Sequence, residues 1–478
     1  MINARACATL NRRLGSVGLA SVLIYGPSPR TLQAWVDNAS CTLFFVFQLA
    51  TLKPKPSVSS TINTHHDDVT CTYCGLLCDD LLVRTDGMTV TPLRNACAKA
   101  TAAYADSSAR VTASIAGQPA ALEQAIAIAV NLLRKARQPL VAGLGADLAG
   151  LRAAFALAEH CGAIVDHLHG SALRQNLKVL QSRGWQTTTL SELRNRADLV
   201  VLVGVNVKVN YQNLIPRFLS PTAALQAERR RVRRLIYLGP AKGAPSACGE
   251  LPLDTLPCDT DALPTLLRAL QSALAGGAAV SGPAKRRKLL VELAAKIKAA
   301  AYPVFVWAAG QLDPAHADLT ISAVCDIVAS LNCTQRAAGL NLGGDDGGQT
   351  AVSAATWLTG FPLSVSYAGN TLDYAPERWS ADALLQDQTV DLCLWISAFS
   401  PRLPPGAANA IPTIVLGPPG MTPAKNSVYI PVGTPGVDHA GQLIRTDAVV
   451  SLPLRQLRHS GLPTVADVLE RMLKALPT

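Results

Sequence analysis

The chain has 478 residues, of which 49% are apolar, 5% aromatic and 16% charged, and it carries a net charge of +10 at pH 7. A single hydrophobic core rarely grows beyond roughly 250–300 residues, so this length predicts several domains and excludes one small domain. The composition excludes a disordered chain. The positive charge does not predict nucleic-acid binding, because no zinc-finger spacing or RNP-type aromatic motif accompanies it.

The first 65 residues differ from the rest of the chain. They contain one acid, Asp37, several arginines and the apolar run 42–50. That run is too short to span a bilayer, which takes about 20 residues, and it lies too far from Met1 to be the core of an ordinary signal peptide. We expect residues 1–65 to be a poorly ordered extension, with a targeting peptide as the alternative. The chain is expected to have no membrane partner.

Residues 66–110 form a compact module with clustered cysteines: Cys71, Cys74, Cys78 and, further on, Cys97. Three thiolates from one turn and a distant fourth can surround a [4Fe–4S] cluster. Zinc also suits four thiolates, and four buried cysteines without metal are a third possibility. The other eight cysteines are scattered singly and are predicted to lie in the core. A clustered set in a long chain indicates a metal centre in a reducing cytoplasm.

The module is expected to contain a hairpin that turns at residues 85–88, and an α/β pattern follows it. Apolar residues recur at helical spacing at residues 120–137 and 285–301, and in the Ala/Leu-rich segment that follows residues 139–145 and ends at His160. The predicted buried strands are residues 139–145, 163–165, 198–205, 234–239, 303–310, 391–398, 411–417 and 427–431. Strands alternating with helices predict parallel sheets covered on both faces. We expect two similar lobes, residues 111–280 and 281–478, divided near an Ala/Gly-rich linker at 274–283.

Three further segments carry polar or charged residues. Residues 341–348 are too glycine-rich for regular structure and are predicted to be a loop, either a flexible connector or a ligand-facing one. His167 and His169 follow a predicted strand, where ligands gather in such folds, so they either line a pocket or are ordinary surface or core histidines. The basic run 229–234 is expected on a surface helix or loop that contributes to contacts between subunits.

The string Cys-x-x-Cys-Gly-Leu-Leu-Cys-Asp-Asp, with residues 95–100 (NACAKA), resembles the amino-terminal cluster module of the B subunit of formylmethanofuran dehydrogenase, a branch of the molybdopterin oxidoreductases. Residues 359–362 (TGFP) and 430–447 resemble later signatures of the same family. The resemblance implies a small iron–sulfur-like module followed by two doubly wound α/β lobes of molybdopterin-oxidoreductase type. It also implies that Lys99 is the basic residue between cluster and pterin, and thus a cofactor-binding candidate.

The chain departs from the redox-active relatives at three positions. Laid onto this sequence, their metal-binding cysteine or selenocysteine falls at Ala149 or a close neighbour, and the methyl group of alanine cannot bind a soft metal. The strand ends at 239–240 and 417–418 are Gly-Pro where the relatives have an acid. The resemblance therefore implies the non-redox form found in methylotrophs, without molybdopterin and without catalytic residues of its own.

In that form the chain is the B subunit of a formyltransferase/hydrolase complex in tetrahydromethanopterin-linked one-carbon metabolism, mainly a scaffold. The implied partners are the other three subunits: A, an amidohydrolase; C; and D, a formyltransferase. Two alternatives stay open. One is the B subunit of a redox-active molybdenum or tungsten formylmethanofuran dehydrogenase, and the other is a non-catalytic molybdopterin-like interaction protein.

Overall fold

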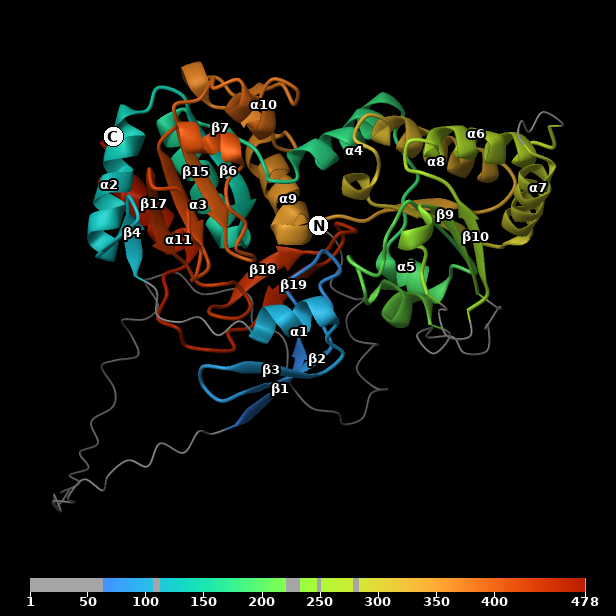
Figure 1. Cartoon of the computed structure of the whole chain (residues 1–478), viewed down its shortest axis with the longest axis horizontal. Helices are drawn as coiled ribbons and strands as arrows, with labels where there is room; N and C mark the ends of the chain where they lie inside the picture. Colours follow the sequence, from blue (N-terminus) through green and yellow to red (C-terminus); the bar gives the residue numbers. More distant parts are fainter. Residues whose placement is uncertain (1–62, 106–111, 221–232, 247–250, 278–282, 478) are drawn as a thin grey trace, which may run out of the picture. The chain divides into compact units, whose positions relative to one another are not determined.

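The computed structural model describes residues 63–105, 112–220, 233–246, 251–277 and 283–477. They form a mixed α/β fold with several sheets (Figure 1), which confirms the predicted fold class at this level. The predicted extension, residues 1–65, falls outside the described residues except for its last three positions. No helix in the described ranges is both long and apolar enough to cross a membrane.

The larger sheet has nine strands in the order β14-β13-β7-β6-β15-β16-β17-β4-β5. Their bounds are β4 Ala113–Ile115, β5 Gln118–Ala120, β6 Pro139–Gly145, β7 Ile164–Val165, β13 Val365–Ser366, β14 Asp373–Tyr374, β15 Leu392–Ser397, β16 Thr413–Gly417 and β17 Ser427–Pro431. The five central strands, from β7 to β17, are parallel, and antiparallel strands flank them. All residues of β6, β15, β16 and β17 are buried, as expected for continuous apolar runs in a covered parallel sheet.

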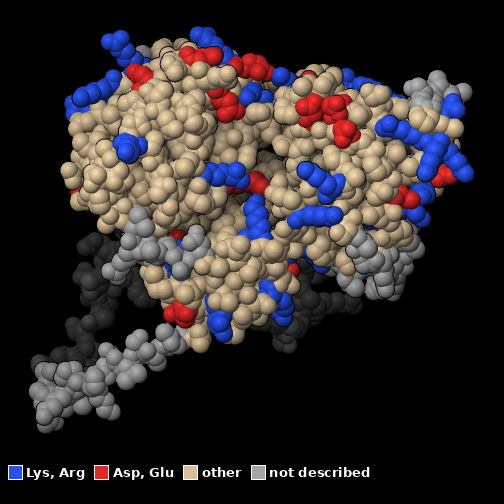
Figure 2. Space-filling view, viewed as in Figure 1, with Lys and Arg blue, Asp and Glu red and all other residues tan. Residues whose placement is uncertain are grey.

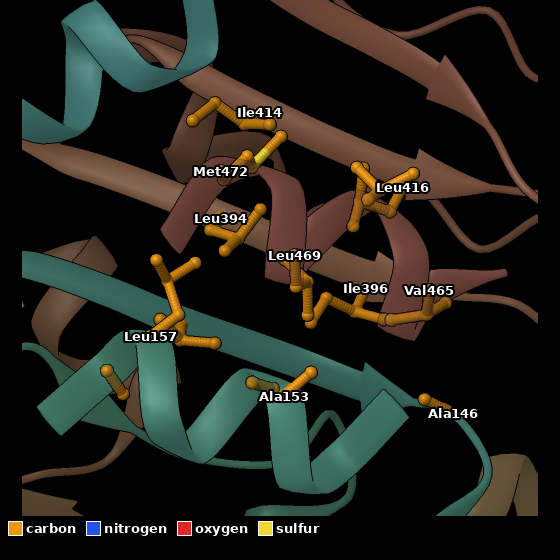
Figure 3. Close-up of a cluster of buried hydrophobic side chains, with 14 of the residues drawn as sticks. Ala146, Ala153, Leu157, Leu394, Ile396, Ile414, Leu416, Val465, Leu469 and Met472 are labelled. Atoms are coloured by element: carbon orange, nitrogen blue, oxygen red, sulfur yellow. The ribbon is translucent and has the colours of Figure 1, made fainter. Parts of the chain in front are cut away.

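Helices cover the larger sheet. They are α2 Leu122–Lys135, α3 Leu148–Cys161, α9 Gly348–Thr359, α10 Ala381–Gln386 and α11 Val465–Ala475. Figure 3 shows Leu157 of α3 and Leu469 of α11 packed with the strand residues Leu394 and Ile396 in one buried cluster. Truncating a buried leucine such as Leu469 to Ala should cost about 2–5 kcal/mol, because a cavity replaces its contacts.

The smaller sheet has five strands, all parallel, in the order β10-β9-β8-β11-β12. Its elements are β8 Leu199–Val203, β9 Arg234–Gly239, β10 Leu253–Pro257, β11 Pro303–Trp307 and β12 Ala338–Asn341, with α4 Gly170–Arg183, α5 Leu190–Asn195, α6 Leu263–Leu274, α7 Ala284–Ala299 and α8 Ala317–Leu331. Alternate residues of β8 enter different cores. Val201 packs with α6, α7 and α8, whereas Val200 packs in a cluster that includes Cys71 and Cys78.

The two sheets do not follow the predicted division at residue 280. In the smaller sheet β11 lies beside β8, with Phe305 opposite Val201, although the division assigns these strands to different lobes. In the larger sheet β15 likewise lies beside β6. The strands of the smaller sheet come from the chain between β7 and β13 of the larger one, so each lobe is assembled from both halves. Short apolar runs predict strands but not their neighbours, which is why the predicted boundary is wrong.

The cysteine-bearing segment forms a third, antiparallel sheet. It consists of β1 Thr64–Val69, β2 Leu81–Thr85 and β3 Val90–Arg94, followed by α1 Ala98–Ala105, and a separate hairpin joins β18 Gly441–Ile444 to β19 Ser451–Leu454. The predicted turn at 85–88 is confirmed. The Asp86 carboxylate accepts hydrogen bonds from the backbone N–H groups of Met88 and Thr89, and Gly87 has a φ of 98°, which glycine adopts at low cost.

The basic run 229–234 is only partly within the described residues, and at its end the prediction of a surface segment is wrong. Arg233 is buried and donates hydrogen bonds to the carbonyl oxygens of Phe218 and Arg194. Arg234 begins β9 and pairs with Asp254. Figure 2 shows Lys and Arg in small groups on the face that it draws, without one broad basic patch.

The single cysteines were expected in the core, and the structure confirms this only in part. Cys325 and Cys393 are buried, Cys161 and Cys258 are partly buried, and Cys333 is exposed. The prediction is therefore wrong for Cys333. The remaining single cysteines lie outside the described residues.

Candidate functional site

The turn between β1 and β2 carries three of the four clustered cysteines. The backbone N–H of Cys71 donates to the Cys78 carbonyl (2.7 Å), and the N–H of Leu77 donates to the Cys74 carbonyl (3.1 Å). Leu77 has a φ of 43°, in the left-handed region that leucine rarely adopts. Cys97 directly precedes α1 and joins the other three around one small cavity.

Gly75 lets this turn pack against the glycine-rich loop after β12. A Cβ atom at Gly75 would lie 1.8 Å from the Gly343 carbonyl oxygen, so only glycine permits the contact. The Gly75 N–H donates to the Asp345 carboxylate (3.1 Å), and the Gly75 carbonyl accepts from the N–H of Thr446. The cysteine turn is thus held by two segments that lie far away in the sequence.

Burial controls the ionisation of the clustered thiols. Burial and the neighbouring Cys78 raise the pKa of Cys71 to about 12. Burial likewise raises the pKa of Cys74 well above its ordinary value and raises that of Cys78, where the nearby Arg217 guanidinium opposes the shift. These thiols are therefore protonated at neutral pH unless a metal ion replaces their protons.

The four cysteines fit a metal centre by their chemistry but not yet by their spacing. Four thiolates satisfy either an iron–sulfur cluster or a closed zinc site. Within the described residues, no three His, Cys, Asp or Glu side chains converge closely enough to ligate one ion. The cavity between them measures about 10 Å³, roughly the volume that one water needs. The metal site stays a prediction.

Lys99 lies between two cavities. It lines the cavity of the four cysteines and also a second one, of about 150 Å³, at the carboxyl ends of β15, β16 and β17. Its Nζ atom is 3.3 Å from the Asp345 carboxylate. Carboxyl ends of parallel strands are the usual place for ligands in such folds, so Lys99 lies where its predicted cofactor role requires it.

Asp346 is the centre of a polar network that sequence analysis did not single out. Its buried carboxylate accepts a hydrogen bond from the Ser400 hydroxyl (2.6 Å), pairs with Arg402 Nε (2.9 Å) and lies 3.3 Å from His169 Nε2. Burial alone would raise its pKa, but the contacts with His169, Ser400 and Arg402 hold the pKa of Asp346 well below its usual range. Asp346 is therefore an anion that ties β7, β15 and the glycine-rich loop together.

His167 and His169 have different roles. His167 is buried, its Nδ1 accepts from the His169 N–H (3.0 Å), and its Nε2 lies 3.3 Å from the Asp346 carbonyl. Burial and the adjacent His169 lower the pKa of His167 to about 3, so it is neutral at physiological pH. His169 lines a third cavity, of about 110 Å³, at the carboxyl ends of β11 and β12.

The glycine-rich segment 341–348 is a loop only in part, because Asn341 ends β12, residues 345–347 form a 3-10 turn and Gly348 begins α9. The segment lines this third cavity and is not a free connector. Amide side chains line the same cavity: Asn176, Asn210, Gln311, Asn341 and Gln349. Sequence analysis could have found the polar network around Asp346 from the two adjacent aspartates in the loop, Asp345 and Asp346. Acids in a glycine-rich loop indicate a ligand-facing or strained turn. Asp346 does have a left-handed φ of 52°.

Ala149 itself does not face these cavities. It is exposed on α3 and lines an outer groove together with Arg152, Leu358 and Glu470. A metal ligand at that position would therefore point away from the carboxyl ends of the central strands. The described residues that line the second and third cavities include no cysteine.

Tyrosine hydroxyls close the two strand ends that lack an acid. Tyr237 donates to the Pro240 carbonyl (3.0 Å) after β9, and Tyr429 donates to the Pro418 carbonyl (2.6 Å) after β16. Both tyrosines are buried. These ends are packed by the chain's own side chains.

No protein-family model matches the chain. Among curated proteins it is 25% identical over 401 residues to the B subunit of the tungsten-containing formylmethanofuran dehydrogenase 2 of Methanocaldococcus jannaschii, covering 80% of this chain and 91% of that protein. A similar protein of Methanococcus maripaludis is 23% identical over 427 residues, covering 85% and 98%. By its sequence and fold, this chain belongs to a class of proteins that resemble the B subunit of formylmethanofuran dehydrogenase.

Within this class the chain resembles the formyltransferase/hydrolase form. It is 28% identical over 343 residues to the B subunit of the formyltransferase/hydrolase complex Fhc of Methylorubrum extorquens, covering 69% of this chain and 87% of that protein. A chain in the crystal structure of the complex FhcABCD from M. extorquens, solved with methylofuran, matches with a TM-score of 0.65 and 27% identity. That match covers 76% of this chain and 98% of the other. The resemblance predicted from the cysteine motif is confirmed.

Proposed function

We propose that this chain is the B subunit of a formyltransferase/hydrolase complex and acts there mainly as a scaffold. The observation that supports this most directly is the structural match, which covers almost the whole of a chain from the FhcABCD complex. The partners would be the other three subunits, namely the amidohydrolase A, C and the formyltransferase D. The reaction would belong to tetrahydromethanopterin-linked one-carbon metabolism in the cytoplasm.

The same proposal assigns the chain no redox catalysis of its own and no molybdopterin. Three features support this: the described residues that line the second and third cavities include no cysteine, Asp346 links the segments beside them, and buried tyrosines pack two strand ends. The finer fold assignment, a cysteine module before two lobes of molybdopterin-oxidoreductase type, belongs to this proposal. Its lobes are discontinuous in sequence.

Cys71, Cys74, Cys78 and Cys97 would hold a [4Fe–4S] cluster, with zinc or no metal as alternatives. The shared cavity and the burial of the thiols support a common site. A bound cluster would supply a rigid cross-link between the β1–β2 turn and α1. The four thiols would release their protons to solvent as the metal binds, and their burial would exclude water from the site.

A second candidate is the redox-active form, since two relatives named as tungsten-containing proteins match at least 80% of the chain. To separate the candidates, the affinity-tagged full chain is purified from its source cells, and the co-purifying proteins are identified by mass spectrometry. Recovery of the A, C and D subunits with formate release from formyl-tetrahydromethanopterin supports the proposal. Recovery of the chain alone, with neither partner proteins nor that activity, contradicts it.

A further inference from the structure

Helix α7 begins with four consecutive cations, Lys285, Arg286, Arg287 and Lys288, which we call the basic turn. The first turn of this helix contains no acid. The aligned peptide dipoles give the N-terminus of a helix a partial positive charge, so acids are stabilising there and cations are unfavourable. Like charges three or four residues apart on a helix also repel each other. The basic turn therefore lowers the stability of the folded chain.

The chain itself does not neutralise the basic turn. Within the described ranges none of its four side chains forms an ion pair, whereas Arg234 and Lys296 nearby share the Asp254 carboxylate. Arg286 is half-buried and its charge acts on Cys258, but the other three cations are exposed. Figure 2 shows Lys and Arg gathered over the region of α7 at the right of the view. The helix thus presents surplus positive charge to its surroundings.

The exposed face of α7 has an apolar centre beyond the basic turn. Lys288, Val291, Ala295 and Lys298 are all exposed and follow one another at intervals of three and four residues, so they lie in a row along the helix. Val291 is 56% exposed. An apolar centre between charged ends is typical of a protein–protein interface. A surface for nucleic acid needs no such centre, because phosphate contacts supply most of its affinity.

We propose that the exposed face of α7 binds an acidic surface of another subunit of the formyltransferase/hydrolase complex. The inference rests on the proposed function, which supplies the partner. Carboxylates of the partner would complement the unpaired cations and speed association. They would also be stabilised by the N-terminus of the helix. The contact would thereby relieve an arrangement that is unfavourable in the isolated chain.

The decisive variant is Lys285→Glu combined with Arg287→Glu, which reverses two exposed charges of the basic turn. Acids suit the N-terminus of a helix, so the isolated variant should unfold at the same temperature as the wild type or at a higher one. Its association with the other subunits should weaken about tenfold or more, since two attractive charges become repulsive. A loss of folding therefore cannot explain a loss of the partner.

The matched control is Arg134→Glu combined with Lys135→Glu. These two cations are also adjacent and exposed, but they lie in the last turn of α2 on the larger sheet, where cations are favourable. The control makes the same change in net charge. It should lower the unfolding temperature slightly and leave the association with the other subunits unchanged.

The experiment uses the tagged full chain purified together with the A, C and D subunits, and it measures the NaCl concentration that releases them. The control should release its partners at the wild-type concentration, and the Lys285→Glu/Arg287→Glu variant at a much lower one. Equal release from all three proteins overturns the inference and leaves the proposed function intact. A wild-type chain that recovers none of the three subunits contradicts both. If the variant keeps its partners but loses binding to random DNA, the face binds nucleic acid and the inference is wrong.

Discussion

Gly75→Ala should uncouple the cysteine turn from the glycine-rich loop. The added Cβ would lie 1.8 Å from the Gly343 oxygen, whereas real Cβ atoms stay beyond about 3.0 Å, so the two backbones must separate by about 1.2 Å. That movement would break the 3.1 Å hydrogen bond from the Gly75 N–H to Asp345. Overpacking costs about 1–3 kcal/mol and a hydrogen bond to a charged group contributes about 1.5–3 kcal/mol. The two effects overlap, so we expect a total loss of about 3 kcal/mol.

The assay is denaturant unfolding of the full chain, with Gly406→Ala as the control. A Cβ at Gly406 meets nothing within 4 Å, so that variant should change the free energy of unfolding by less than about 0.5 kcal/mol. Equal stability of the two variants would refute the packing of the turn against the loop.

Three further outcomes follow from the site. Asp346→Asn should lower the free energy of unfolding by about 1–3 kcal/mol, since the buried carboxylate holds Arg402 and His169, and an unchanged value in denaturant unfolding would contradict the network. Because the folded pKa of His167 is about 3, the unfolded chain binds its proton first, so stability should fall as pH drops from about 6.5 toward 3; His167→Gln should show a smaller decline in the same titration. Cys97→Ser should reduce the iron or zinc bound per chain in elemental analysis, whereas Cys333→Ser, at an exposed position, should not.

The sequence predicts the strands well because their apolar runs are continuous. β8, β15 and β16 lie within the predicted ranges, since every residue in each is buried. Periodicity and propensity report on burial of a segment, and here these parallel strands are buried along their whole length.

The neighbours of these strands could not be predicted. The pairing of β11 with β8 depends on which hydrophobic faces meet, and an apolar run carries no information about its partner. The same limit explains Asp346, whose contact with His169 joins residues 177 positions apart. The same limit applies to Ala149, because a motif placed by spacing alone does not say which face of α3 a residue occupies.

The cysteines were predictable as a cluster because three of them share one turn. The contacts that hold that turn could not be predicted. The hydrogen bond from Gly75 to Asp345 spans 270 positions, and Gly75 looks in sequence like any turn glycine.

We propose that a fold shared with formylmethanofuran dehydrogenase here serves a formyltransferase/hydrolase complex without redox chemistry of its own. The most direct measurement is elemental analysis for Mo, W, Fe and Zn of the complex purified through the tagged chain, combined with two activities on the same sample. We expect this sample to release formate from formyl-tetrahydromethanopterin with neither Mo nor W bound. Dye-linked oxidation of formylmethanofuran together with stoichiometric Mo or W would contradict it.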